Sequence, residues 1–84
     1  MMNFKNEENR IYAEDENGKT IAEVTFYEIE EGKYNIDHTF VDDSLRGQGI
    51  GKELVKEAVK ILAEKGVKIE ATCPFAQKWL SEHK

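Results

Sequence analysis

The residues best suited to chemistry lie in the segment 42–52, DDSLRGQGIGK, between an expected strand and an expected helix. Its glycines carry no side chain, so the backbone can approach a bound group closely. The N–H groups of a first helical turn are free to donate to an anion, and the helix dipole adds favourable charge there. Arg46 and Lys52 add positive side chains. The segment therefore predicts a cradle for a phosphate group.

Two well-known phosphate-binding patterns do not fit this segment. A P-loop requires Ser or Thr after Gly-Lys, but Glu53 follows Lys52, and Arg46 stands where the first glycine would be. The dinucleotide-binding pattern needs its third glycine at position 52, where Lys stands. A turn that binds no ligand is the remaining alternative. We disfavour it because each glycine costs about 1 kcal/mol in a helix.

The first half of the chain reads as an antiparallel meander. Alternating apolar and polar residues predict three strands, at 10–15, 19–29 and 34–41. Asn17-Gly18 predicts a type I′ turn, because both of its central positions need positive φ. Residues 1–9 carry no such alternation, and we expect them to be flexible.

The third of these strands places a histidine among apolar neighbours. Strict alternation puts one set of side chains on the face that we expect to meet the core, and these are Tyr34, Ile36, His38 and Phe40. The opposite face carries Asn35, Asp37 and Thr39.

The second half changes to helical spacing. Apolar residues recur on one side of a helix over 50–62, and Gly66 stands where a left-handed residue would end it. A strand follows at 67–72, and Pro74 suits the first position of a short last helix with Cys73 as its N-cap. A strand, a helix and a strand form a crossover, which predicts parallel strands joined with a right-handed sense. The fold class is therefore α/β, a mixed sheet with one long helix packed on it.

Length and composition exclude several classes of protein. A chain of 84 residues and 9.7 kDa is expected to form one domain, residues 1–84. Acidic residues outnumber basic ones, 17 to 12, which argues against a surface for nucleic acid or for an anionic membrane. One cysteine and two histidines do not suggest a metal site, and no apolar run approaches a membrane span. Because the N-terminus has no apolar leader, we expect a cytoplasmic protein.

Arg46, Gly49 and Gly51 fit a third pattern, Arg/Gln-x-x-Gly-x-Gly/Ala, and Val41 stands where an apolar residue ends the preceding strand. This pattern resembles the coenzyme A loop of the GNAT superfamily of N-acetyltransferases. The order of strand, loop, helix, strand and helix agrees with that family over roughly residues 20–80.

The resemblance implies a truncated acyl-CoA N-acyltransferase fold. The cofactor would be acetyl-CoA, and the acceptor would be an amine on a small molecule or a protein. The pyrophosphate would lie on backbone N–H groups of the glycine segment, and the pantetheine arm between the strands 34–41 and 67–72. The cofactor-binding residues implied in this way are Phe40, Val41, Arg46, Gly47, Gln48, Gly49, Ile50, Gly51 and Lys52.

Cys73 is the first catalytic candidate, because the resemblance places the acetyl thioester near it. The chain is most similar to minimal, single-domain GNAT-like proteins, in which Cys-Pro opens the last helix. A helix start lowers the pKa of a thiol. Cys73 is therefore suited to accept the acetyl group or to protonate the departing thiolate, and no tyrosine follows Tyr34 to do so. The alternative is a small buried hydrophobe.

His38 is the second catalytic candidate, as a general base or as a partner for Cys73, since histidine titrates near neutral pH. The alternative is a hydrogen-bonded core histidine. For the whole chain the leading prediction is an N-acetyltransferase. The alternatives are a module that binds coenzyme A or acyl-CoA without efficient catalysis, and a small interaction protein.

Overall fold

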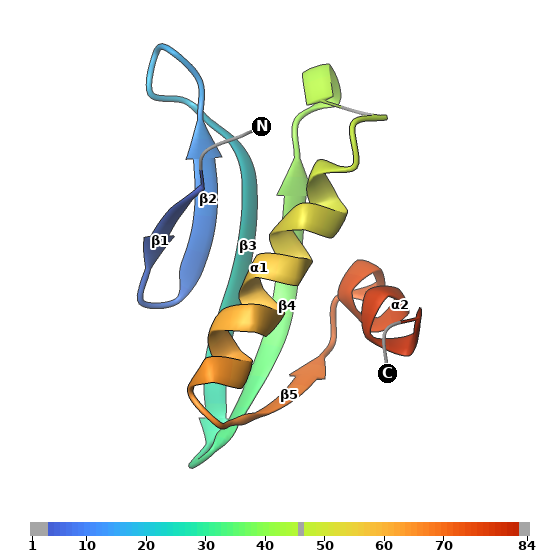
Figure 1. Ribbon diagram of the computed structural model, residues 1–84. Helices are drawn as coiled ribbons and strands as arrows, with labels where there is room; N and C mark the ends of the chain where they lie inside the picture. Colours follow the sequence, from blue (N-terminus) through green and yellow to red (C-terminus); the bar gives the residue numbers. More distant parts are fainter. Residues whose placement is uncertain (1–3, 46, 83–84) are drawn as a thin grey trace.

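The computed structural model describes residues 4–45 and 47–82, which form one five-stranded sheet and two α-helices (Figure 1). The strands lie in chain order across the sheet, and all neighbours are antiparallel except β4 and β5, which are parallel. The elements are β1 (Lys5–Glu7), β2 (Arg10–Glu14), β3 (Thr20–Glu30), β4 (Lys33–Val41), the 3₁₀ helix η1 (Asp43–Leu45), α1 (Ile50–Glu64), β5 (Lys68–Ala71) and α2 (Pro74–Glu82). This arrangement confirms the predicted mixed α/β fold.

The strand β1 is an element that the sequence analysis missed. Lys5 pairs with Tyr12, so β1 forms the outer edge of the sheet beside β2. The expectation that residues 1–9 would be flexible is wrong for this strand, while residues 1–3 lie outside the described part of the chain. All residues of β1 are exposed, so no apolar alternation marks the strand in the sequence.

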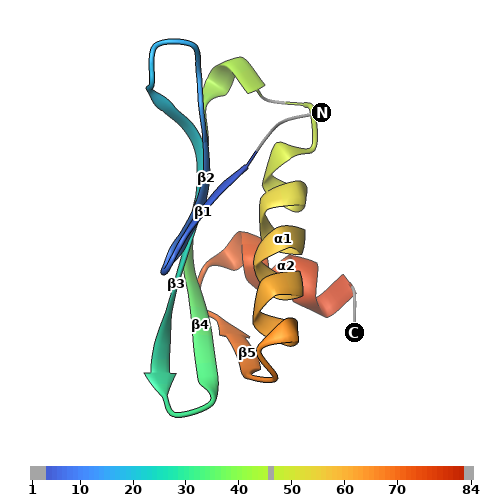
Figure 2. The ribbon, with the colours of Figure 1, turned by 60° about the vertical axis from the view of Figure 1, so that its left-hand side comes forward.

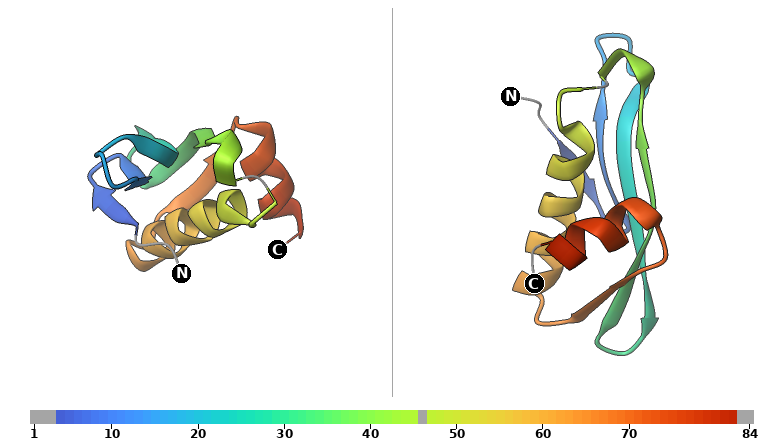
Figure 3. Two further views of the ribbon diagram at one scale, coloured as in Figure 1. Left: turned by 90° about the horizontal axis from the view of Figure 1, so that it is seen from above. Right: turned by 90° about the vertical axis from the view of Figure 1, so that its right-hand side faces the viewer.

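Both helices cover the same face of the sheet, and its other face is open, as Figure 2 and Figure 3 show. The apolar side of α1 packs against β2, β3 and β4 to form the core. The buried residues of this core are Ile11, Ala13, Ala22, Val24, Phe26, Ile36, Leu54, Val55, Ala58, Leu62, Cys73 and Ala76. Burial of one large apolar side chain contributes roughly 1.5–3 kcal/mol. The apolar side chains between the sheet and the helices are therefore the main source of stability.

The helix α1 ends as its sequence predicts. Gly66 has φ +72, and its N–H donates to the Ala63 carbonyl at 3.0 Å. The Val67 N–H donates to the Leu62 carbonyl at 3.4 Å. These two bonds satisfy carbonyls that the last turn of a helix leaves without partners. They also turn the chain back towards β5.

The turn between β2 and β3 differs from the predicted type I′ form. Among the described residues only glycines have positive φ, so Asn17 lacks the left-handed conformation that such a turn requires. Instead, the Asp15 carboxylate accepts the N–H groups of Asn17 and Lys19 at 2.9 and 3.0 Å. Gly18 supplies the positive φ of this turn, at +81. Hydrogen bonds to the Asp15 side chain therefore hold this turn, which has one left-handed residue instead of two.

A β-bulge interrupts β4. Phe26 of β3 pairs with Ile36, but the preceding Thr25 pairs with His38, so Asp37 is an extra residue on β4. The Thr25 hydroxyl donates to the Asp37 carboxylate at 2.9 Å, and both residues therefore lie on one face. An extra residue shifts the alternation of all later side chains by one position.

The bulge corrects the predicted orientation of the second half of β4. His38 and Phe40 are exposed on the open face of the sheet, so the prediction that they would meet the core is wrong. Thr39 and Val41 lie on the helix side instead, where Thr39 contacts Cys73.

The strand β5 leaves β4 about halfway along its length. The last paired residues are Ile36 and Ala71, and the Ile36 carbonyl then accepts the N–H groups of Thr72 and Cys73 at 3.1 and 3.3 Å. From this junction the chain turns away into α2, while β4 continues to Val41 (Figure 1). The C-terminal half of β4 is therefore not paired with β5, and α2 contacts β4.

Asn35 is buried at the junction, and its side-chain amide donates to the Thr72 hydroxyl at 3.0 Å. Because Asn35→Ala removes this bond, we expect it to lower the free energy of unfolding by about 1–2 kcal/mol in urea denaturation. The matched control is Asn17→Ala in the exposed turn, which should change that free energy by less than about 0.5 kcal/mol. Equal losses in the two variants would show that Asn35 does not hold the junction.

Candidate functional site

Gly47, Gly49 and Gly51 each have a reason to be glycine that does not involve a ligand. Gly47 and Gly49 have φ +82 and +71, in the left-handed region that other residues disfavour. Gly51 lies in the first turn of α1, and a Cβ atom there would be 2.9 Å from the Phe75 ring. The backbone therefore favours glycine at positions 47 and 49 with or without a ligand, and the case for an anion depends on the groups around them.

Backbone N–H groups at the start of α1 are available to bind an anion near these glycines. The first helical bond runs from the Glu53 N–H to the Gly49 carbonyl at 3.2 Å, so the N–H groups of residues 50–52 precede it. Gly49 is the N-cap and has no side chain with which to cap them. The Gln48 N–H, which was expected to bind phosphate as well, donates instead to the Leu45 carbonyl at 3.4 Å.

A hollow of about 250 Å³ lies over this turn. The end of β4, the glycine turn and the first turns of both helices line it, through Val41, Leu45, Gly47, Gly49, Ile50, Gly51, Lys52 and Phe75. Lys52 brings positive charge to the hollow. Arg46, the other predicted cation, lies outside the described residues.

Cys73 is buried at the N-terminus of α2, beside the junction of β4 and β5. Its carbonyl accepts the first bond of the helix, from the Gln77 N–H at 2.9 Å, as predicted for the N-cap. Its Sγ lies 3.3 Å from the Thr39 hydroxyl oxygen. Thr39 reaches this position because the bulge turns it towards the helices.

Opposing effects act on the pKa of Cys73. Burial raises the pKa of the thiol, but hydrogen bonds from the Thr39 hydroxyl and from the backbone N–H groups of Ala76 and Phe75 outweigh burial. The pKa of Cys73 therefore lies below the ordinary value for cysteine. A thiol of this kind forms the nucleophilic thiolate at lower pH and releases its proton more readily.

His38 does not partner Cys73 as predicted. It lies on the open face, whereas Cys73 lies on the helix side, where Thr39 takes the predicted place of His38. The alternative of a core histidine is also wrong, because the residue is exposed. The part of His38 in proton transfer stays a prediction. The Phe40 side chain likewise lies on the open face, and of the two predicted residues at the end of β4 it is Val41 that lines the hollow.

Asp42 shapes the entrance to the glycine turn. Its N–H donates to the Ile21 carbonyl at 2.8 Å, which ties the end of β4 to β3. Its carboxylate accepts the hydroxyl and the N–H of Ser44 at 2.7 and 3.1 Å, and these bonds lower the pKa of Asp42. The carboxylate is therefore held at the start of η1.

Two residues of the site escaped the sequence analysis. Thr39 contacts the thiol only because of a bulge, and the sequence of β4 carries no glycine that would mark one. The contact of Phe75 with Gly51 depends on how the two helices meet. Neither contact has a local signal.

Thr39→Val keeps the shape of the side chain but removes the hydroxyl that stabilises the thiolate. We expect the pKa of Cys73 to rise, so that alkylation of Cys73 by iodoacetamide at neutral pH slows several-fold. The pH dependence of the alkylation rate measures this. Thr39→Ser retains the hydroxyl and should restore the wild-type profile. An unchanged profile in Thr39→Val would remove Thr39 from the site.

Residues 4–45 and 47–82 contain no cluster of three or more side chains able to ligate a metal. Neither helix in this part of the chain has the length and apolar character that crossing a membrane requires.

Comparison with solved structures supports the fold. A GCN5-like protein from Staphylococcus aureus, solved by NMR, is 39% identical and matches 98% of this chain and 80% of its own, with a TM-score of 0.80. A GNAT-family N-acetyltransferase from Escherichia coli, solved in complex with CoA, is 28% identical. It matches 69% of this chain and 35% of its own, with a TM-score of 0.61.

Curated relatives and a family model agree with the structural matches. Protein NATD1 of Xenopus tropicalis is 41% identical over 54 residues, which are 62% of this chain and 50% of that protein. Human NATD1 is 39% identical over 49 residues, 58% of this chain and 43% of that protein, so the match spans about half the length of these relatives. The family model described as GCN5-related N-acetyl-transferase matches residues 10–84. The chain therefore belongs to the GCN5-related N-acetyltransferase (GNAT) family.

Proposed function

We propose that the protein transfers an acetyl group from acetyl-CoA to an amine. One observation carries the proposal, namely that three features lie on neighbouring elements. They are the N–H groups at the start of α1, the part of β4 that is not paired with β5, and the thiol of Cys73 at the start of α2. Membership of the GNAT family supports acyl transfer, and a relative solved with CoA supports a cofactor of that type.

The pyrophosphate of the cofactor suits the hollow over the glycine turn. There it would accept hydrogen bonds from the N–H groups of residues 50–52, and the dipole of α1 would add favourable charge. Lys52 contributes a positive side chain to the same hollow. The positions where Gly47 and Gly49 would carry Cβ atoms have no protein atom within 4 Å, which leaves space for the phosphates.

The pantetheine arm suits the edge of β4 beyond the junction. An extended chain with amide groups can pair with a free strand edge as an added strand would. Phe40 and Val41 lie beyond the last pair of β4 with β5, and Val41 also lines the hollow over the glycine turn. An arm that starts from this hollow and follows β4 towards Ile36 brings its thioester to Cys73.

Two routes of transfer are compatible with Cys73. In the direct route the neutral amine attacks the thioester carbonyl and the carbon–sulfur bond breaks. Cys73 protonates the departing thiolate, and the proton that the amine loses restores the Cys73 thiol. In the covalent route the Cys73 thiolate attacks the thioester carbonyl, and the carbon–sulfur bond to coenzyme A breaks to release its thiolate. The neutral amine then attacks the acetyl-Cys73 thioester, which restores the Cys73 thiolate, and the proton that the amine loses neutralises the coenzyme A thiolate. The lowered pKa of the thiol favours both roles.

A second candidate function is a module that binds coenzyme A or acyl-CoA without efficient catalysis. The observation that favours it is the open face of the sheet, because the residues described here place both helices on the other face (Figure 2). The short turn at 15–19 between β2 and β3 supplies no element that would enclose an acceptor. The acetyltransferase should lose its activity when Cys73 is replaced. The binding module should bind the cofactor equally well with or without Cys73.

Gly49→Ala tests the cofactor site. A Cβ atom would enter the hollow and the positive φ would be strained, so we expect affinity for CoA to fall at least tenfold in isothermal titration calorimetry, roughly 1.4 kcal/mol. Gly66→Ala is a matched control, since Gly66 has φ +72 against +71 and an equally open Cβ position. Both variants should lose about 1 kcal/mol of folding stability. If the Gly66 variant weakens CoA binding as much, the site is misplaced.

Cys73→Ala separates catalysis from binding. We expect acetyl transfer from acetyl-CoA to a panel of primary amines to fall about 100-fold, measured as release of the CoA thiol, while affinity for CoA is retained. Intact-mass spectrometry of the wild-type protein with acetyl-CoA then distinguishes the routes, because only the covalent route adds an acetyl group to Cys73. Wild-type turnover in Cys73→Ala would exclude both roles, and binding without turnover in the wild type would favour the binding module.

A further inference from the structure

The strand β5 forms one border of the sheet (Figure 1). It pairs with β4 on one side, and within residues 4–45 and 47–82 no strand pairs with its outer edge. An edge strand presents N–H and C=O groups with which a further strand can pair. The groups that β5 presents therefore decide which strand fits this edge.

Alternate residues of β5 and its flanks direct their backbone groups to the outer edge. The N–H groups of Lys68 and Thr72 donate to carbonyls on the side of β4, at 2.8 and 3.1 Å. Successive residues of a strand direct their backbone groups to opposite edges. The N–H and C=O groups of Val67, Ile69 and Ala71 therefore point away from β4.

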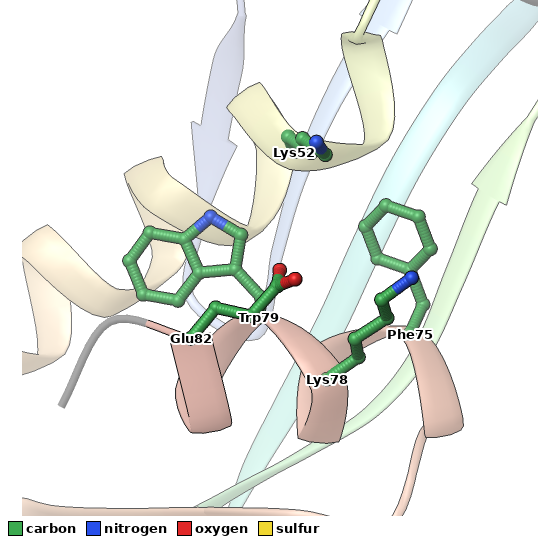
Figure 4. A pocket seen from close by; sticks show the side chains of 5 residues that line it. All are labelled: Lys52, Phe75, Lys78, Trp79 and Glu82. Carbon is green, nitrogen blue, oxygen red and sulfur yellow. The ribbon is translucent and has the colours of Figure 1, made fainter.

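The helix α2 leaves the middle of this edge accessible. Figure 4 shows the Phe75 and Trp79 side chains rising from α2 towards α1, and they line a hollow of about 80 Å³ between the two helices. The Gln77 side chain of α2 reaches the C-terminal end of β5, where it donates to the Ala71 carbonyl at 3.0 Å. This contact lies two residues beyond Ile69, which stands at the centre of the edge.

The remaining groups of this edge are complementary to a second copy of the same edge. In an antiparallel pair centred on Ile69, the N–H of each Ile69 meets the C=O of the other. The Ala71 N–H of each copy meets the Val67 carbonyl of the other in the same way. The two groups left out already have partners, because the Val67 N–H donates to the Leu62 carbonyl at 3.4 Å and the Ala71 carbonyl accepts the Gln77 amide.

The exposed charges of β5 select this register. With Ile69 opposite Ile69, Lys68 of each copy stands opposite Glu70 of the other. Opposite charges at facing positions stabilise an antiparallel pair, and like charges destabilise it. A pair centred on Lys68 or on Glu70 would place like charges opposite each other. A carboxylate can accept on both oxygens, so the contact of Glu70 with Lys33 at 2.7 Å is compatible with this pair.

Apolar side chains on the helix side favour the same pairing. Val67, Ile69 and Ala71 are half-buried and pack against the core. A two-fold axis perpendicular to the sheet relates two antiparallel strands, so the helix sides of both copies lie on one face. The two Ile69 side chains then meet on that face, and their remaining apolar surface is removed from water.

We propose that two copies of the chain associate through β5, which pairs antiparallel with β5 of the other copy and joins the two sheets into one. The association goes beyond the proposed function and does not depend on it. The end of β4, the glycine turn and the starts of both helices line the hollow proposed for the pyrophosphate. Each copy therefore keeps that hollow when β5 is paired.

Charge reversal at the exposed positions of β5 tests the pairing. Lys68→Glu and Glu70→Lys each place like charges opposite one another, so we expect each variant alone to associate about tenfold more weakly than the wild type in sedimentation equilibrium. An equimolar mixture of the two variants restores both opposite pairs and should recover association. Lys60→Glu makes the same charge change at an exposed position of α1 and should associate as the wild type does.

Amide hydrogen exchange of the wild type locates the contact. The N–H groups of Lys68 and Thr72 bond on the side of β4, so their protection should not depend on protein concentration. The N–H groups of Ile69 and Ala71 should become protected as the concentration rises, because only the paired edge gives them partners.

The outcomes separate this proposal from the proposed function. A wild type that keeps the 9.7 kDa mass of one chain at every concentration would overturn the association and leave the proposed function standing. A dimer whose Ile69 protection does not change with concentration, or variants that stay apart when mixed, would also overturn it. Loss of coenzyme A binding by the wild type would overturn the proposed function alone.

Discussion

The carbonyl of Ile36 is the point on which the site depends. It accepts the N–H groups of both Thr72 and Cys73, and at this point the pairing of β4 with β5 ends. A parallel pair that continued to Val41 would cover the edge of β4 and carry the thiol away from it. Because the chain turns into α2 here, the rest of β4 is not paired with β5, and a cysteine stands at a helix start. The Asn35 to Thr72 hydrogen bond holds the same junction.

The bulge at Asp37 also shapes the site, because it decides which side chain of β4 faces Cys73. A strand without it would present His38 to the helices and Thr39 to the open face, because side chains alternate strictly in a regular strand. With it, a hydroxyl meets the buried Cys73 sulfur, and the thiolate gains a hydrogen bond that offsets part of the cost of burial. The buried position of the thiol and its lowered pKa are therefore compatible.

Contact between the two helices brings the glycine turn and the start of α2 together. Phe75, which follows Pro74 at the start of α2, lies against Gly51 in the first turn of α1. This contact brings two helix N-termini to one side of the sheet, where their dipoles both favour negative charge. It also forms part of the wall of the hollow over the glycine turn. In the described part of the chain, both helices therefore lie on the same face of the sheet.

The sequence alone determined the elements whose signals are local. The helical period of residues 50–62, the left-handed Gly66 and the place of Cys73 before Pro74 depend on neighbouring residues, and the structure agrees with each. The glycine turn was found in the same way, although its glycines have folding reasons of their own. Tertiary structure alone decided the edge strand β1, the bulge at Asp37 and the contact of Phe75 with Gly51. These features depend on pairing register and on packing between segments far apart in the chain, and no spacing within one segment encodes them.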